Sequence, residues 1–268
     1  MAALTTTAQN PDSMFVVKAL SEARSLPRTT NFPLHFARLF IGRPYIAHTL
    51  EVNDEERLVT NTRQLDCTTL VENVTALTLC VYRHLYTWRD FLNALVEMRY
   101  RRGLLNGYTS RLHYFSDWID DNTAMDIVAE VQSPTPPFTA TQTIDVHYMS
   151  QHPQAYKALK QHPELVPVIK AQEDSLTGRQ YRYIPKSEVS NTKAMRNAVR
   201  DGDIIAFTCS KPGLDIAHLG FAVWRENGLH LLNASQLHKR VVEEPMTLGQ
   251  YLSKHPSHTG IRIVRILH

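Results

Sequence analysis

The first hundred residues carry apolar side chains at helical spacing. Between Leu70 and Val81 these side chains recur every three or four positions, which predicts a helix with one apolar stripe facing the core. The same periodicity predicts helices over residues 14–26, over a short stretch that ends at Gly42, and over residues 87–100. The N-terminal part is therefore expected to be helical.

The last third of the chain has a different pattern. Short apolar runs separated by Gly, Asn and Asp predict strands, and Asn227-Gly228 is a strong hairpin signal. The strands are expected over residues 203–207, 218–224, 229–236 and 260–266. Because helices come first and antiparallel strands follow, the order predicts an α+β fold rather than alternating βαβ units.

The middle of the chain is less regular. Residues 103–121 are rich in aromatic side chains, which we expect to wall a pocket, and residues 123–131 are expected to form a short helix. Residues 1–13 are expected to be a disordered lead-in. The remainder, residues 14–268, is expected to be one domain with a helical and loop insertion near residues 85–200.

Composition narrows the possible classes of protein. The chain has 268 residues and a net charge of +3, with 43% hydrophobic residues, so it is typical of a globular protein and too weakly basic to predict nucleic-acid binding. Three cysteines exclude a disulfide scaffold. No apolar run predicts a membrane span, and no signal peptide is visible at the start. We expect a monomer that is either cytoplasmic or exported after removal of a leader.

Thirteen histidines offer many possible metal ligands. However, His147, His152 and His162 lack metal-ligand spacing, and the sequence contains neither an HExxH motif nor paired CxxC motifs. We therefore expect no metal and no cofactor.

Cys67 stands at the predicted start of the helix over residues 70–81. Asp66 suits the N-cap, and Glu72 follows Thr69 at capping-box spacing. The unpaired N–H groups and the positive dipole end favour a thiolate, so we expect a lowered pKa for the Cys67 thiol and donors for an oxyanion. Taken alone, Cys67 is more often a small buried side chain than a nucleophile.

A cysteine nucleophile needs a base and an orienting partner. His218 stands at the mouth of an apolar strand, and strand parity places His218 and Asn233 on one face of the sheet. If Trp224 pairs with Leu231, Asn233 lies about 13 Å along the strand from the point opposite His218. We therefore expect a longer hairpin loop or a bulge. Alternatively, His218 is a satisfied core residue and Asn233 bonds its own backbone.

The ordered motifs resemble a known superfamily. They are Arg43-Pro44-Tyr45, Leu65-Asp66-Cys67-Thr68-Thr69, Asp201-Gly202-Asp203-Ile204-Ile205, His218-Leu219-Gly220-Phe221 and Asn233-Ala234-Ser235. Their order is similar to that of the NlpC-like bacterial cell-wall cysteine peptidases and amidases, and most closely to the N-acetylmuramoyl-L-alanine amidase-like branch. Asp66-Cys67-Thr68-Thr69 replaces the superfamily's usual Asp-Cys-Ser-Gly, in agreement with this branch.

The resemblance implies a papain-like core, with a helix-borne cysteine packed on an antiparallel sheet. It implies that Cys67 is the nucleophile, that His218 is the base, and that Asn233 stands where the superfamily often has histidine. Tyr45 matches a tyrosine whose hydroxyl lies near the nucleophile and supports the oxyanion. The long gap between Tyr45 and Cys67 implies an inserted hairpin over the cleft. The pattern of residues 51–64 is itself typical of a connecting hairpin or loop. The resemblance also points to the bacterial periplasm.

The function expected from the resemblance is hydrolysis of the amide between N-acetylmuramic acid and L-alanine in peptidoglycan fragments (muropeptides). Ser110, Arg111 and Tyr114 are candidate substrate contacts, because arginine suits carboxylates and aromatic rings suit sugar faces. A surface ion pair explains Arg111 equally well. Two alternatives remain: a D-Glu–diamino acid endopeptidase with the same site, and a binding module without catalysis. A low pKa of the Cys67 thiol would favour catalysis, and an ordinary thiol would favour the binding module.

Overall fold

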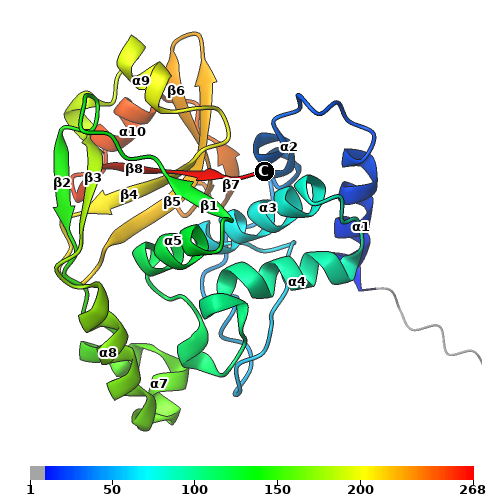
Figure 1. The fold of residues 1–268 in the computed structure, drawn as a ribbon, viewed down its shortest axis with the longest axis vertical. Helices are drawn as coiled ribbons and strands as arrows, with labels where there is room; N and C mark the ends of the chain where they lie inside the picture. Colours follow the sequence, from blue (N-terminus) through cyan, green and yellow to red (C-terminus); the bar gives the residue numbers. More distant parts are fainter. Residues whose placement is uncertain (1–9) are drawn as a thin grey trace, which may run out of the picture.

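The computed structural model describes residues 10–268. Five helices of the N-terminal half gather on one side of a β-sheet (Figure 1). They are α1 (Pro11–Ala23), α2 (Phe32–Leu39), α3 (Cys67–Tyr82), α4 (Trp88–Arg99) and α5 (Phe115–Ala124). Two short helices, α9 (Lys193–Ala198) and α10 (Leu248–Ser253), pack on the opposite face of the sheet.

The sheet has the strand order β2-β3-β8-β4-β5-β6-β7, and β1 pairs with β8 off this path. The paired strands are all antiparallel. Their bounds are β1 (Val128–Glu130), β2 (Ala140–Thr143), β3 (Gln180–Pro185), β4 (Ile204–Cys209), β5 (Ile216–Arg225), β6 (Gly228–Ser235), β7 (Arg240–Glu243) and β8 (His258–Ile266). The predicted α+β class with an antiparallel sheet is confirmed.

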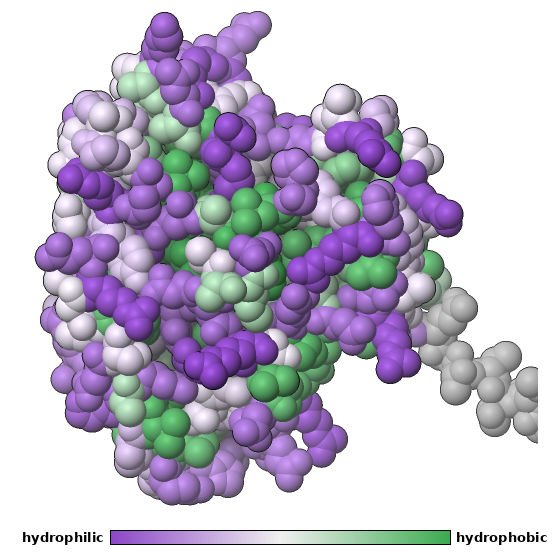
Figure 2. All heavy atoms as spheres, viewed as in Figure 1, coloured by the Kyte–Doolittle hydropathy of each residue, from purple (hydrophilic) through white to green (hydrophobic). Residues whose placement is uncertain are grey.

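The central strands are buried on both faces. In β4, Ile204 and Ala206 belong to the core under α3, whereas Ile205 and Phe207 belong to the core under α10. This alternation is the period-2 pattern of a strand, applied to a sheet that is covered on both sides. On the face of the molecule that Figure 2 shows, most exposed side chains are hydrophilic, and hydrophobic side chains form patches between them.

A third hydrophobic cluster lies under α6 (Tyr148–Gln151), α7 (Lys157–Gln161) and α8 (Val166–Leu176). Of the stretch 85–200 expected as an insertion, α4 and α5 contribute to the core under α3, while α6–α8 have this separate core. Short 3₁₀ helices occur at Arg101–Gly103, Tyr108–Ser110, Pro153–Ala155, Pro163–Leu165 and Lys186–Glu188.

Three local predictions are wrong. Helix α1 begins at Pro11, within the expected lead-in, because Asn10 caps it and Pro11 suits the first turn; residues 1–9 lie outside the described part. Residues 51–64 form turns and irregular chain, so the inserted hairpin is absent and the connecting loop, the alternative, is present. Residues 123–131 contain the end of α5 and strand β1 rather than a helix, because pairing with β8 overrides the weak helical pattern.

The hairpin between β5 and β6 turns one residue earlier than the Asn227-Gly228 signal indicated. Arg225 pairs with Gly228, and Trp224 pairs with Leu229 instead of Leu231, so Glu226 and Asn227 form a two-residue turn and the expected longer loop is absent. A β-bulge does occur, but it lies between β4 and β5, where His218 pairs with Phe207 and Ile216 pairs with Thr208. The bulge bends β5 just before His218.

Gly220 allows β5 and β6 to approach closely. A Cβ atom at this position would lie 2.7 Å from Leu232 O and 3.0 Å from the Cβ atom of Asn233. Gly220 is therefore the cross-strand neighbour of Asn233, and His218 is two residues further along the same face. This spacing places Asn233 within reach of the imidazole.

Candidate active site

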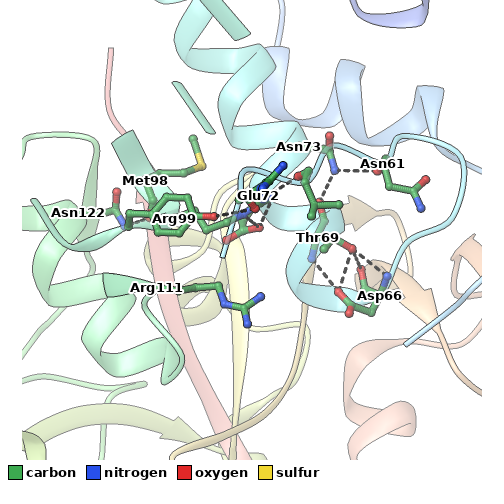
Figure 3. A network of polar contacts seen from close by, with 12 residues as sticks. Asn61, Asp66, Thr69, Glu72, Asn73, Met98, Arg99, Arg111 and Asn122 are labelled. Carbon is green, nitrogen blue, oxygen red and sulfur yellow. Dashed lines mark hydrogen bonds and ion pairs between the residues drawn. The ribbon is translucent and has the colours of Figure 1, made fainter. Parts of the chain in front are cut away.

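Cys67 is the first residue of α3, as predicted. Asp66 caps the helix: its carboxylate accepts a hydrogen bond from the Thr69 N–H at 2.8 Å, and the Thr69 hydroxyl accepts one from the Asp66 N–H at 2.9 Å (Figure 3). This capping box fixes the residue at which the helix begins. The Cys67 thiol consequently lies at the positive end of α3, which packs against β5 and β6.

Glu72 does not cap the helix, so that part of the prediction is wrong. Its carboxylate forms a buried ion pair with Arg99 of α4 at 2.8 Å (Figure 3). Arg99 also donates a hydrogen bond to Val59 O at 2.6 Å, and the Asn73 amide donates to Asn61 O at 3.3 Å. These bonds hold residues 51–64 against the start of α3, beside the nucleophile candidate.

His218 and Asn233 are hydrogen-bonded through His218 Nε2 and Asn233 Oδ1 at 2.9 Å. Asn233 is completely buried, and its Nδ2 atom donates to Glu244 Oε1 at 3.1 Å. Because a carboxylate only accepts, Glu244 fixes the amide with Oδ1 toward the imidazole. His218 must then carry its proton on Nε2, which leaves Nδ1 as the free acceptor. The predicted pairing of His218 with Asn233 is present despite the wrong hairpin register.

Glu244 and His238 extend this chain of hydrogen bonds. Glu244 is only 2% exposed, and its Oε2 atom lies 3.1 Å from His238 Nε2. Sequence reasoning missed both residues. Glu244 directly follows β7, a strand of four residues that was not predicted, so no pattern indicated that its carboxylate would turn inward.

The Cys67 thiol lies against β5 at Leu219, the residue that follows His218. The N–H groups of Leu219 and Thr68 point to the sulfur, but within residues 10–268 no hydrogen bond joins the thiol to His218. Burial, and the charge of Asp66, raise the pKa of the Cys67 thiol to about 12. Burial also lowers the pKa of His218, partly offset by the bond to Asn233. The expected lowering of the thiol pKa is therefore wrong, and the resting pair is neutral near pH 7.

Tyr45 lies beside the start of α3, because it forms a parallel bridge with Leu65. Its backbone N–H donates to Lys239 O at 3.0 Å. Burial raises the pKa of Tyr45, and the charges of Cys67 and Asp66 raise it further. The phenol therefore remains a hydrogen-bond donor close to the sulfur.

Two depressions flank this centre. The aspartate-side pocket has a volume of about 230 Å³ and is lined by Asp66, Thr68, Glu51, Arg111 and neighbours. The histidine-side groove has a volume of about 480 Å³ and is lined by His218, Lys211, Lys239, His255, His258 and neighbours. A bound substrate can therefore extend away from Cys67 in two directions.

The three predicted substrate contacts have different surroundings. Arg111 lines the aspartate-side pocket, forms ion pairs with Glu51 and Glu56, and has a buried Nε without a hydrogen-bond partner. The Ser110 hydroxyl donates to Gly107 O at 2.7 Å within its own turn. The Tyr114 hydroxyl donates to Glu173 at 2.7 Å, in the cluster under α6–α8. Arg111 alone of the three borders the pocket next to Cys67.

Within residues 10–268, no group of three or more His, Cys, Asp or Glu side chains is placed to hold a metal ion. In the same part of the chain, no helix is long and apolar enough to cross a bilayer. The candidate site brings together a thiol, an imidazole, an amide and a phenol.

The bond from Glu244 predicts how His218 is oriented. Wild-type protein should show neutral His218 with its proton on Nε2 in ¹⁵N NMR spectra of the imidazole. Replacement of Asn233 by Ala removes the acceptor, so both tautomers should appear and turnover should fall about 10²-fold. Glu244→Ala should have a similar, weaker effect. Glu243→Ala is the matched control, because the carboxylate of Glu243 pairs with Arg225 and not with Asn233; an equal effect of Glu243→Ala would contradict the assignment.

The raised thiol pKa predicts how Cys67 reacts with iodoacetamide. Because the thiolate fraction is small and grows with pH, the alkylation rate should rise about tenfold per pH unit between pH 6 and 9, without a plateau. Peptide mapping separates Cys67 from Cys80 and Cys209. A rapid, pH-independent rate at Cys67 between pH 5 and 7 would show a resting thiolate–imidazolium pair, contrary to the neutral pair.

Comparison with known proteins places the chain in a family. The AmiA-like family, described as N-acetylmuramoyl-L-alanine amidase-like, matches residues 35–261. An N-acetylmuramoyl-L-alanine amidase from Bacteroides uniformis is 40% identical in a solved structure, with a TM-score of 0.82, over 88% of this chain and 98% of that one. A Bacteroides fragilis protein provisionally named as a xylanase is 39% identical, with a TM-score of 0.80, over 87% of this chain and 100% of its own.

A Legionella pneumophila protein shares the fold at 21% identity, with a TM-score of 0.73, over 96% of this chain and 94% of its own. No match was found among curated proteins. The family match spans most of the chain, and the Bacteroides uniformis amidase is similar over nearly its whole length. The chain therefore belongs to the AmiA-like, N-acetylmuramoyl-L-alanine amidase-like family.

Proposed function

We propose that this protein hydrolyses the amide between N-acetylmuramic acid and L-alanine in peptidoglycan fragments, with Cys67 as nucleophile and a papain-like, NlpC-type arrangement of the site. The observation that carries the proposal is the hydrogen bond from His218 Nε2 to the buried Asn233. This bond leaves His218 Nδ1 as an acceptor, one residue from Leu219, whose N–H points to the Cys67 sulfur. Membership of an amidase-like family supports the choice of bond.

The first half of the reaction forms a thioester. Cys67 Sγ attacks the carbonyl carbon of the muramic acid lactyl group, and His218 Nδ1 takes the thiol proton. The negative charge that develops on the carbonyl oxygen is stabilised by the Cys67 N–H at the start of α3 and by the Tyr45 hydroxyl. The intermediate collapses when the C–N bond breaks, and His218 gives its proton to the departing amine of L-alanine.

The second half regenerates the enzyme. Water replaces the peptide, His218 Nδ1 takes a proton from the water, and the oxygen attacks the thioester carbon. The C–S bond breaks, the muramic acid carboxyl group is released, and the Cys67 thiol recovers its proton. Asn233 and Glu244 hold the imidazole in one orientation through both halves.

A neutral resting pair is compatible with this sequence of steps. The Cys67 proton leaves only when the substrate carbonyl carbon is in place. The negative charge then passes to the carbonyl oxygen, which accepts hydrogen bonds from the Cys67 N–H and the Tyr45 hydroxyl. The cost of a buried thiolate is thus confined to the transition state. The raised pKa of Cys67 is nevertheless the observation that favours the rival function, a peptidoglycan-binding module without catalysis.

Glycoside hydrolysis is a weaker fit to the site. It requires two free carboxyl groups on either side of the sugar bond. The carboxylates near Cys67 are already engaged: Asp66 caps α3, Glu72 pairs with Arg99, and Glu51 pairs with Arg111. A thiol beside an imidazole instead suits acyl transfer.

Product analysis tests the proposal. Wild-type protein incubated with defined muropeptides should release an intact stem peptide with a free N-terminal L-alanine, identified by mass spectrometry. Cys67→Ala should lower the rate by about 10⁴-fold or more, because the nucleophile is lost, and should leave the melting temperature within about 2 °C. Cys209→Ala, at a cysteine outside the site, is the matched control and should retain activity.

Other outcomes separate the rivals. Cleavage between D-Glu and the diamino acid would assign an endopeptidase. Binding of muropeptides without any cleavage would assign the binding module. Full activity of the Cys67→Ala variant would remove Cys67 from the mechanism.

A further inference from the structure

The histidine-side groove differs in charge from the pocket on the other side of Cys67. Lys211 and Lys239 line the groove together with His255 and His258, and no acidic side chain is among its lining residues. Within residues 10–268, neither lysine forms an ion pair with a carboxylate. The groove therefore presents two positive charges that nothing in the described chain neutralises.

One residue that lines the groove, His258, carries an unpartnered polar atom. His258 is 7% exposed, and its Nδ1 atom is buried without a hydrogen-bond partner. Its ring stacks on His255 with the ring centroids 5.0 Å apart, and His255 stacks on Tyr251 at 4.1 Å. A buried ring nitrogen without a partner is costly unless a ligand or water reaches it, so this atom marks a place for a hydrogen-bonding group.

The aspartate-side pocket has the opposite character. Glu51, Asp66 and Glu72 line it, and its one arginine, Arg111, is held by Glu51 and Glu56. A ligand with several carboxylates would find no unpaired arginine or lysine among the residues that line this pocket. A substrate that is negatively charged at one end only would therefore place that end in the histidine-side groove and its other end in the aspartate-side pocket.

The chemistry of the reaction decides which end enters which depression. His218 lines the groove and, in the proposed function, gives its proton to the departing amine. The amine side of the scissile bond must therefore lie on the His218 side. That side is the stem peptide, whose D-Glu and diamino acid carry free carboxylates. The sugar side is uncharged, because its lactyl carboxyl group is part of the scissile amide.

We propose that the histidine-side groove is the subsite for the anionic stem peptide, and that Lys211 and Lys239 select peptides with free carboxylates over amidated ones. This assignment rests on the proposed function. The carboxylates lie against the two lysines, and the His258 ring nitrogen supplies a hydrogen bond in the groove. The uncharged sugar occupies the aspartate-side pocket.

Two muropeptides with the same sugar and the same peptide sequence test the assignment, one with free carboxyl groups and one with these groups amidated. Wild-type protein should prefer the free acid. The double variant Lys211→Gln/Lys239→Gln should lose about five- to tenfold in kcat/KM on the free acid, mainly through KM. On the amidated muropeptide, kcat/KM of the double variant should stay within about twofold of the wild-type value. The preference of wild-type protein for the free acid should become smaller at high salt.

Lys193→Gln/Lys254→Gln is the matched control, because it removes the same charge at exposed positions outside the groove. It should behave as wild type on both substrates. The assignment would be overturned if Lys211→Gln/Lys239→Gln lowered kcat/KM equally on the free acid and the amide, or lowered it on neither. Equal rates of wild type on the two substrates would also overturn it.

Binding measured without turnover separates this inference from the proposed function. Calorimetry with the free stem peptide and the Cys67→Ala protein should show binding that weakens five- to tenfold when Lys211 and Lys239 are also replaced. If wild type cleaves neither muropeptide but this charge dependence holds, the amidase activity fails and the peptide subsite stands. If cleavage occurs as proposed and peptide binding ignores the lysines, the subsite fails and the amidase stands.

Discussion

A buried amide cannot be left without partners, and this constraint on Asn233 organises the candidate site. Asn233 has no exposed surface, so both ends of its amide must be satisfied within the protein. Glu244 accepts from the nitrogen, which leaves the oxygen for His218. The orientation of the imidazole therefore follows from a carboxylate on the far side of the amide. His238 bonds the second oxygen of Glu244 and closes the chain toward solvent.

The other half of the site depends on the start of α3. The capping box between Asp66 and Thr69 sets the first helical residue, and the buried pair of Glu72 with Arg99 fixes the rotation of the helix. The helix and the sheet then meet where Leu219 contacts the Cys67 sulfur. A small movement of either element would change the position of the thiol relative to the imidazole, so the packing of α3 on β5 matters for the proposed chemistry.

Sequence patterns predicted the parts of the site that local physics controls. Asp66 before an apolar stripe indicated the N-terminus of α3, and strand parity placed His218 and Asn233 on one face. The hairpin register was wrong because the turn lies at Glu226-Asn227, one residue before the Asn227-Gly228 signal, and a shift of one residue in the turn moves the pairing by two. The reach from His218 to Asn233 comes from a bulge and from the close approach at Gly220, neither of which periodicity predicts.

Long-range contacts account for the remaining differences. Glu244, Lys211 and His258 lie on separate segments that only the sheet order brings together. The pKa of Cys67 was predicted to fall from the helix dipole, whereas burial and Asp66 raise it, because desolvation depends on packing that the sequence does not display. The hydroxyl of Tyr114, a predicted substrate contact, donates to Glu173, on a helix 59 residues away in the chain.

The assignment of Cys67 as nucleophile is tested most directly by the covalent intermediate. Acid quenching within milliseconds of mixing protein with a muropeptide, followed by mass spectrometry of the intact and digested protein, should reveal the muramoyl group attached to the Cys67 peptide as a thioester. Release of the stem peptide with an adduct on another residue would contradict a cysteine mechanism. A burst of product without any protein adduct would contradict it as well.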